Sequence, residues 1–123
     1  MRGPVERRIL VIDDEAPLRE YMARTLAGAG YAVVTASDGR EGVAAAQAQT
    51  PDVVVVDVNL PHLDGYGVLA QLRAREATAA TPVVFCSGDC RHREIARALG
   101  AQAFLGKPFS SSALLTLVNG ALP

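Results

Sequence analysis

Short apolar runs alternate with segments of helical periodicity along most of this chain. Five runs are rich in β-branched residues and are not interrupted by polar residues, at positions 9–12, 32–34, 53–56, 83–85 and 103–105. Uninterrupted runs of this kind are typical of strands that are buried on both faces. Strands that alternate with helices predict a parallel sheet with helices covering both of its faces.

The segments that follow the apolar runs carry the signals of helices. After the first run, Leu18, Met22 and Leu26 recur every four residues, and the glycines at 28 and 30 are expected to end that helix. Three later helices have expected N-terminal caps. Asp38 caps the first, with Glu41 completing a capping box; Asp64 caps the second, and Ser110 or Ser111 caps the third. One helix is therefore expected after each strand.

A helix is also expected to begin near Cys90. Ile95 and Leu99 lie four residues apart and predict the face that this helix turns toward the core. Arg93 and Arg97 are also four apart and are expected to share an exposed face. That face is either an ordinary solvated surface or a docking patch for an acidic partner or a second copy of the chain.

Composition and charge narrow the class of protein. The 123 residues suffice for one domain; half of them are hydrophobic, a fifth are charged, and two cysteines form no disulfide framework. A net charge of −1 gives no basic field for nucleic acid, and no apolar stretch approaches the roughly 18 residues of a membrane span. We expect a cytoplasmic protein with a flexible extension at residues 1–7 and one domain at 8–123, binding neither nucleic acid nor membrane.

Polar residues follow four of the five apolar runs, where each strand would end. They are Asp13 and Asp14 after the first run, Asp57 and Asn59 after the third, Ser87 after the fourth, and Lys107 with Pro108 after the fifth. Ligands of open parallel sheets bind beyond the carboxyl ends of the strands. A single aspartate at a strand end often only caps the next helix, but the four groups together predict a functional site.

Another set of candidate ligands is formed by Cys86, Cys90 and His92. Soft-metal sites generally need four ligands at tighter spacing. Cys86 ends an apolar run and is expected to be a small buried hydrophobic residue. We therefore expect no metal there, and we expect His62, in the loop after Pro61, to be exposed.

The motifs of this chain resemble those of the receiver domains of two-component response regulators. They are Asp13-Asp14, Asp57 after a run of valines, Leu60-Pro61-x-x-Asp64-Gly65, Ser87-Gly88 and Lys107-Pro108-Phe109, within about residues 8–117. The resemblance implies an α/β fold, a flavodoxin-like, doubly wound sandwich of five βα units with the parallel sheet order 2-1-3-4-5. In that order the first and third strands are neighbours, so Asp13, Asp14 and Asp57 would converge.

Converging carboxylates need a cation between them. Two carboxylates about 5 Å apart at an effective dielectric near 20 repel by roughly 3 kcal/mol. Oxygen ligands without His or Cys suit Mg²⁺. By resemblance, Asp14 and Asp57 give carboxylate oxygens, Asn59 gives its backbone carbonyl, and Asp13 acts through water.

The resemblance also implies the chemistry of the site. Asp57 would take a phosphoryl group from the phosphohistidine of a sensor histidine kinase or a histidine phosphotransfer protein. Lys107 would supply a compact cation and Ser87 a hydroxyl donor to the phosphoryl oxygens. The surface of the fourth helix, fifth strand and fifth helix would then change, and a downstream protein partner, an effector domain or a second copy in a phosphorylation-dependent homodimer would bind it.

Two further features belong to this switch. Phe104 matches the aromatic residue that turns inward in the family when the hydroxyl of Ser87 moves, although an aromatic residue here is also typical of an ordinary core. The Lys107–Pro108 peptide is expected to be cis, which X-Pro bonds adopt readily.

Two other functions are weighed against the switch. A hydrolase of the haloacid dehalogenase type also uses a strand-end aspartate, but it needs a second aspartate two residues later, where this chain has Asn59. A docking module that works without phosphorylation does not need the intact set of Asp57, Ser87 and Lys107. The sequence leaves open the cognate kinase, the output partner, and whether the native protein is a single-domain regulator or longer.

Overall fold

The computed structural model describes residues 6–122, so residues 1–5 of the expected extension lie outside it. It contains one five-stranded parallel sheet with the order β2-β1-β3-β4-β5. The strands are β1 (Arg8–Ile12), β2 (Ala32–Ala36), β3 (Val53–Asp57), β4 (Val83–Ser87) and β5 (Ala103–Gly106). All five predicted strands are confirmed, as is their order.

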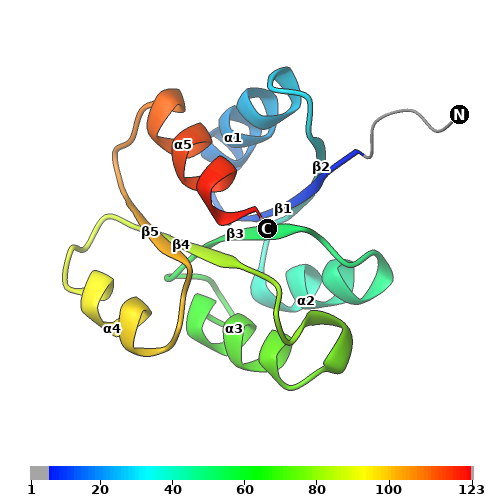
Figure 1. Ribbon diagram of the computed structural model, residues 1–123. Helices are drawn as coiled ribbons and strands as arrows, with labels where there is room; N and C mark the ends of the chain where they lie inside the picture. The colour runs from blue at the N-terminus through cyan, green and yellow to red at the C-terminus, as the bar shows by residue number, and fades with distance from the viewer. Residues whose placement is uncertain (1–5, 123) are drawn as a thin grey trace, which may run out of the picture.

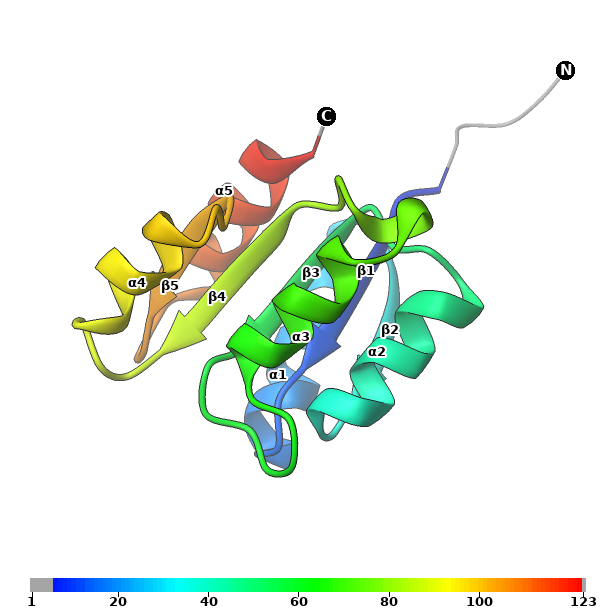
Figure 2. The same cartoon turned by 90° about the horizontal axis from the view of Figure 1, so that it is seen from below.

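Helices cover both faces of this sheet. They are α1 (Ala16–Gly28), α2 (Gly39–Ala48), α3 (Gly65–Arg73), α4 (His92–Ala98) and α5 (Ser111–Ala121), with a short 3₁₀ helix at Glu76–Thr78. Helices α1 and α5 lie on one face of the sheet and α2, α3 and α4 on the other (Figures 1 and 2). None of the helices within residues 6–122 is long and apolar enough to cross a membrane.

Two apolar clusters, one on each face of the sheet, form the core. Val54, Val56 and Phe85 belong to the cluster beneath α2, α3 and α4, whereas Val53 and Val55 belong to the cluster beneath α1 and α5. Successive residues of a strand point to opposite faces. The uninterrupted valine run of β3 is therefore needed because both faces of this strand are covered.

The predicted caps hold the helix starts. Asp38 accepts a hydrogen bond from the backbone N–H of Glu41, and Asp64 accepts one from Gly67. Ser110 caps α5 in the same way. The expected capping box at Asp38 differs in one respect, since the Glu41 carboxylate accepts from the hydroxyl of Ser37, the residue before the cap.

The expected orientation of α4 is wrong. Ile95 and Leu99 are 45% and 49% exposed, and Ala96 is the buried residue of this helix. The helix has seven residues and begins at His92 instead of near Cys90. The chain after α4 turns back toward Ala96, and the backbone N–H of Ala101 donates to the Ala96 carbonyl at 3.0 Å.

Candidate functional site

The register of the sheet brings the predicted polar residues to one edge. Asp57 is the last residue of β3 and pairs with Cys86 of β4, while Ser87 pairs with Gly106 of β5. Ile12 pairs with Val56, so Asp13 lies directly beyond the end of β1, beside Asp57. One carboxylate oxygen from each of Asp13, Asp14 and Asp57 lies within 4.8 Å of the other two.

Lys107 joins this acidic group from the end of β5. Its Nζ donates to Oδ2 of Asp57 at 2.7 Å and to Oδ2 of Asp13 at 3.3 Å, and it lies 3.7 Å from a carboxylate oxygen of Glu15. It is the only lysine in the chain. The Lys107 backbone N–H donates to the Ser87 carbonyl at 2.8 Å, and the Lys107–Pro108 peptide is cis.

Burial shapes the charges of the site. Asp13 is fully buried and Asp57 is 5% exposed, whereas Asp14 lies on the surface. Burial raises the pKa of Asp13, against the lowering effects of the Glu15 N–H and of Lys107, and the charge of Asp57 raises it further. Burial acts to lower the pKa of Lys107, but its hydrogen bond to Asp57 and the charges of both aspartates raise it overall.

Backbone groups orient the two buried aspartates. The N–H of Asn59 donates to Oδ1 of Asp57 at 3.1 Å, and the N–H of Glu15 donates to Oδ1 of Asp13 at 2.9 Å. In each residue the second oxygen, Oδ2, therefore faces Lys107. The side chains are held with one oxygen fixed by the backbone and the other directed to the shared cation.

The backbone at the start of α3 packs closely against the backbone of Asp57. A Cβ atom at Gly65 would lie 2.5 Å from the backbone carbonyl oxygen of Asp57, closer than carbon and oxygen can approach. The start of α3 can therefore lie this close to the end of β3 only with glycine at this position. This contact gives a physical reason for the Asp64-Gly65 pair in the sequence.

The site has a surplus of negative charge. Asp13, Asp14 and Asp57 face one ammonium group, so two negative charges are left uncompensated when all three are ionised. Their donors are all oxygens. A hard cation such as Mg²⁺ fits both the charge and the donor type.

Ser87 lies at the same edge but faces another partner. Its Oγ is 2.7 Å from Nδ1 of His92 and accepts a hydrogen bond from the Asp89 N–H at 3.0 Å. His92 was not predicted from the sequence as a residue of this site. The spacing of the two residues was the available signal, because His92 follows the strand-end Ser87 by five positions and so falls at the start of α4.

A second residue that the sequence did not predict supports the β1–α1 connection. The guanidinium of Arg19 donates to the backbone carbonyl of Asp13 at 2.8 Å. Arg19 lies in the first turns of α1, so its side chain reaches back over the loop that carries Asp13 and Asp14. The signal here was weak, because an arginine on an amphipathic helix is usually a solvated residue.

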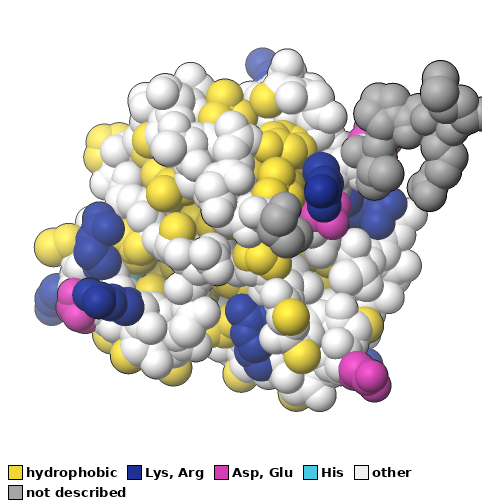
Figure 3. All heavy atoms as spheres, in the orientation of Figure 1, with side chains coloured by type: hydrophobic (Ala, Val, Ile, Leu, Met, Phe, Trp, Pro, Cys, Tyr) yellow, Lys and Arg dark blue, Asp and Glu magenta, His cyan; other side chains and the backbone are white. Residues whose placement is uncertain are grey.

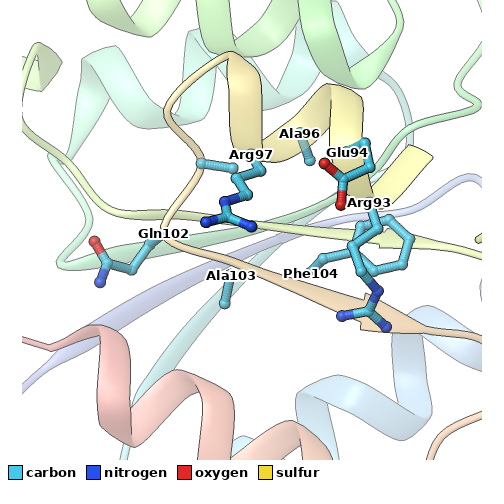
Figure 4. Close-up of a pocket in the computed structure, with 8 residues that line it drawn as sticks. Arg93, Glu94, Ala96, Arg97, Gln102, Ala103 and Phe104 are labelled. Atoms are coloured by element: carbon cyan, nitrogen blue, oxygen red, sulfur yellow. The ribbon is translucent and has the colours of Figure 1, made fainter. Parts of the chain in front are cut away.

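Phe104 is 9% exposed and lies inside the apolar cluster on the α4 side of the sheet. The Cζ atom of Arg93 lies 4.8 Å from the centre of its ring, a cation–π arrangement. Both residues line a pocket of about 340 Å³ between α4 and β5, together with Glu94 and Arg97 (Figure 4). Phe104 is thus packed in the core beneath the Arg93 guanidinium, and its role as a switch residue stays a prediction.

The remaining candidates contribute no ligand to the acidic group. Cys86 is fully buried, and burial raises the pKa of its thiol to about 12, so it is a neutral core residue. Cys90 is exposed, and His92 faces Ser87 instead of a thiol. His62 is exposed, as predicted, with a φ of 68°.

A family model described as the response regulator receiver domain matches residues 9–119. The chain belongs to this family. The predicted resemblance to receiver domains is therefore confirmed.

Two curated relatives show the extent of the similarity. Response regulator MprA of Mycolicibacterium vanbaalenii is 37% identical over 115 residues, which cover 94% of this chain and 50% of that protein. The alkaline phosphatase synthesis transcriptional regulatory protein PhoP of Bacillus subtilis is 36% identical over 106 residues, covering 86% and 44%. The chain spans about half the length of these relatives.

Solved receiver structures have the same fold. The chemotaxis response regulator CheY4 of Vibrio cholerae has a TM-score of 0.90 and 32% identity, covering 96% of this chain and 100% of that one. The receiver domain of sensor histidine kinase PA1611 from Pseudomonas aeruginosa has a TM-score of 0.87 and 27% identity, covering 95% and 98%. That receiver domain has a magnesium ion coordinated in its active-site cleft.

Proposed function

We propose that this receiver domain is a phosphoacceptor switch in which Asp57 takes a phosphoryl group from a phosphohistidine. The donor would be a sensor histidine kinase or a histidine phosphotransfer protein. The observation that carries the proposal is the position of Lys107, whose Nζ contacts the carboxylates of both Asp57 and Asp13. A cation between two buried carboxylates is arranged to stabilise added negative charge at Asp57.

Asp57, Lys107 and Ser87 would each have a different role in phosphoryl transfer. Asp57 would present Oδ2 as the nucleophile, because this oxygen lies beside the Lys107 ammonium while the Asn59 N–H holds Oδ1. Lys107 stays protonated and would move its hydrogen bonds to the phosphoryl oxygens. Ser87 would donate its hydroxyl proton to another of these oxygens. Transfer of this kind depends mainly on positioning and on charge neutralisation.

The acidic group would hold Mg²⁺. Asp13, Asp14 and Asp57 are the carboxylates for it, with Asp13 acting through water, and Asn59 would add its backbone carbonyl. When bound, the ion would neutralise charge on the phosphoryl oxygens that Lys107 does not reach. The two uncompensated negative charges of the site support this assignment.

The output surface would be formed by α4, β5 and α5. Basic side chains gather over α4 in the space-filling view (Figure 3), and Arg91, Arg93 and Arg97 are exposed there. The exposed Ile95 and Leu99 add an apolar part to this surface. A downstream protein, an effector domain or a second copy of the chain would bind it once Asp57 is phosphorylated.

Phosphorylation by a small donor tests this proposal without the cognate kinase. Acetyl phosphate with Mg²⁺ should add one phosphoryl group to the wild-type protein, measured by intact mass. Asp57→Asn should remove the adduct and EDTA should suppress it. An unmodified wild-type protein under these conditions would refute the proposed function.

A further inference from the structure

The hydroxyl of Ser87 has two hydrogen-bond partners in the free protein. Its Oγ accepts from the backbone N–H of Asp89 at 3.0 Å and lies 2.7 Å from Nδ1 of His92. A serine hydroxyl has a single proton to donate. The direction of the contact with His92 therefore decides whether that proton is already in use.

The surroundings of His92 favour a proton on its other ring nitrogen. Nε2 lies 4.0 Å from Oδ2 of Asp89, a carboxylate whose pKa is lowered by its hydrogen bonds to Arg91. The Arg91 guanidinium also pairs with this carboxylate, at 2.6 Å, but a protonated Nε2 still faces an acceptor oxygen, whereas an unprotonated Nε2 would direct its lone pair at that oxygen. A neutral imidazole carries one proton, and with that proton on Nε2 the hydrogen bond has Nδ1 as acceptor and Ser87 as donor.

Aromatic packing fixes the imidazole in this position. The ring is 19% exposed and meets the Tyr66 ring edge-on, with centroids 6.1 Å apart. Tyr66 in turn packs edge-on against Phe85 of β4 at 5.3 Å. His92 is the first residue of α4, so its hydrogen bond joins the end of β4 directly to this helix.

We propose that His92 is a positioning residue that holds the Ser87 proton away from the phosphoryl site and couples its release to α4. The proposal rests on the proposed function of Asp57. Ser87 can donate either to His92 or to a phosphoryl oxygen, so the phosphorylated state must break this hydrogen bond. The first turn of α4 then loses its side-chain link to the sheet edge.

This route differs from the one expected of Phe104. The aromatic ring lies in the apolar cluster beneath Arg93 and belongs to β5, whereas His92 begins α4 itself. The Ser87–His92 hydrogen bond is present in the same structure and has still to break. The signal to α4 therefore passes through His92.

Binding of beryllofluoride, which mimics an aspartyl phosphate, tests the proposal. Dissociation constants are measured at pH 8 with Mg²⁺ from amide NMR titrations. His92→Leu keeps bulk but removes the acceptor, and should bind about threefold to tenfold more tightly than wild type. His92→Asn places an acceptor oxygen where Nδ1 lies, and should bind within about twofold of wild type.

A second background separates hydrogen bonding from packing. In Ser87→Ala protein there is no proton to hold, so adding His92→Leu should leave the dissociation constant unchanged. Equal affinities of wild type and His92→Leu, or the same gain in the Ser87→Ala background, would overturn the role of His92. A wild-type protein that fails to bind beryllofluoride would overturn the role of Asp57 itself, and that of His92 with it.

The ring nitrogens can also be observed directly in the wild-type protein. The chain has two histidines, and the exposed His62 serves as an internal reference. Nitrogen NMR of the free protein at pH 8 should find His92 with its proton on Nε2, and beryllofluoride should change its nitrogen shifts more than those of His62. A proton on Nδ1, or shifts unaffected by beryllofluoride, would contradict the proposal even if the variants do not fold.

Discussion

Nζ of Lys107 lies 2.7 Å from Oδ2 of Asp57, although 50 positions separate the two residues in the chain. The contact exists because β3 and β5 both end at the same edge of the sheet, on either side of β4. It places the only lysine of the chain against the proposed acceptor. Two predictions concern this charge arrangement.

Replacing Lys107 with methionine should slow phosphorylation by acetyl phosphate at least about tenfold, because a preorganised cation at the phosphoryl oxygens is lost. The rate is measured by intact mass against time. Arg24→Met, on an exposed position of α1, makes the same change of charge away from the site and serves as the control. Equal rates in Lys107→Met and wild type would show that Lys107 has no part in transfer.

Asp13→Asn should stabilise the metal-free protein and weaken its response to Mg²⁺. Because burial raises the folded-state pKa of Asp13, its ionised form favours unfolding, and stability falls as the pH rises from about 4 through that raised value. At pH 7 in EDTA the melting temperature of the variant should rise by roughly 2–5 °C. Mg²⁺ should raise the melting temperature of wild type more than that of the variant.

The control for this change is Glu20→Gln, which removes an exposed carboxylate of α1. Its melting temperature should follow wild type with and without Mg²⁺. A lower melting temperature for Asp13→Asn in EDTA would mean that the contacts of Asp13 with Lys107 and the Glu15 N–H outweigh the cost of burying its charge.

The strand-end residues were predictable because parallel topology alone brings them together. Uninterrupted runs such as 53–56 identify buried strands, and alternation with helices makes them parallel, so Asp13, Asp57 and Lys107 must lie at one edge. The strand order was supplied by the family resemblance. Neither the hydrophobic pattern nor the family resemblance predicts the distances and hydrogen-bond directions at the site.

The orientation of α4 was not predictable from periodicity. Ile95 and Leu99 do share a face, but spacing says only which residues lie together and not which face turns inward. In a helix of seven residues, the small Ala96 packs on the sheet and the larger apolar residues remain outside. The link between Ser87 and His92 was missed for a related reason, since it depends on where α4 begins.

The lifetime of the phosphorylated state should depend on Asn59. Its side chain is exposed beside Asp57 and is small and polar, so it can orient a water toward the phosphorus. Asn59→Arg should lengthen the half-life of the adduct severalfold by blocking that water, as followed by intact mass after removal of acetyl phosphate. Gln71→Arg, exposed on α3, adds the same side chain elsewhere and should decay like wild type. Unchanged decay in Asn59→Arg would exclude this role.

The output surface should respond to the phosphoryl mimic. Residues 87–107 include Ser87, α4 and β5, and their amide hydrogen exchange should change on addition of beryllofluoride with Mg²⁺. Residues 38–48, which include α2, should change less because they lie at the other edge of the sheet from β5 (Figure 1). Equal changes in the two segments would argue against an output surface at α4, β5 and α5.

Asp57 itself should carry the phosphoryl group. Borohydride reduces an aspartyl phosphate to homoserine, so treatment of the phosphorylated protein followed by peptide mass spectrometry marks the modified residue. Wild-type protein exposed to acetyl phosphate and Mg²⁺ should contain homoserine at position 57 and unchanged aspartate at positions 13 and 14. Homoserine at position 13 or 14, with position 57 unmodified, would contradict this assignment.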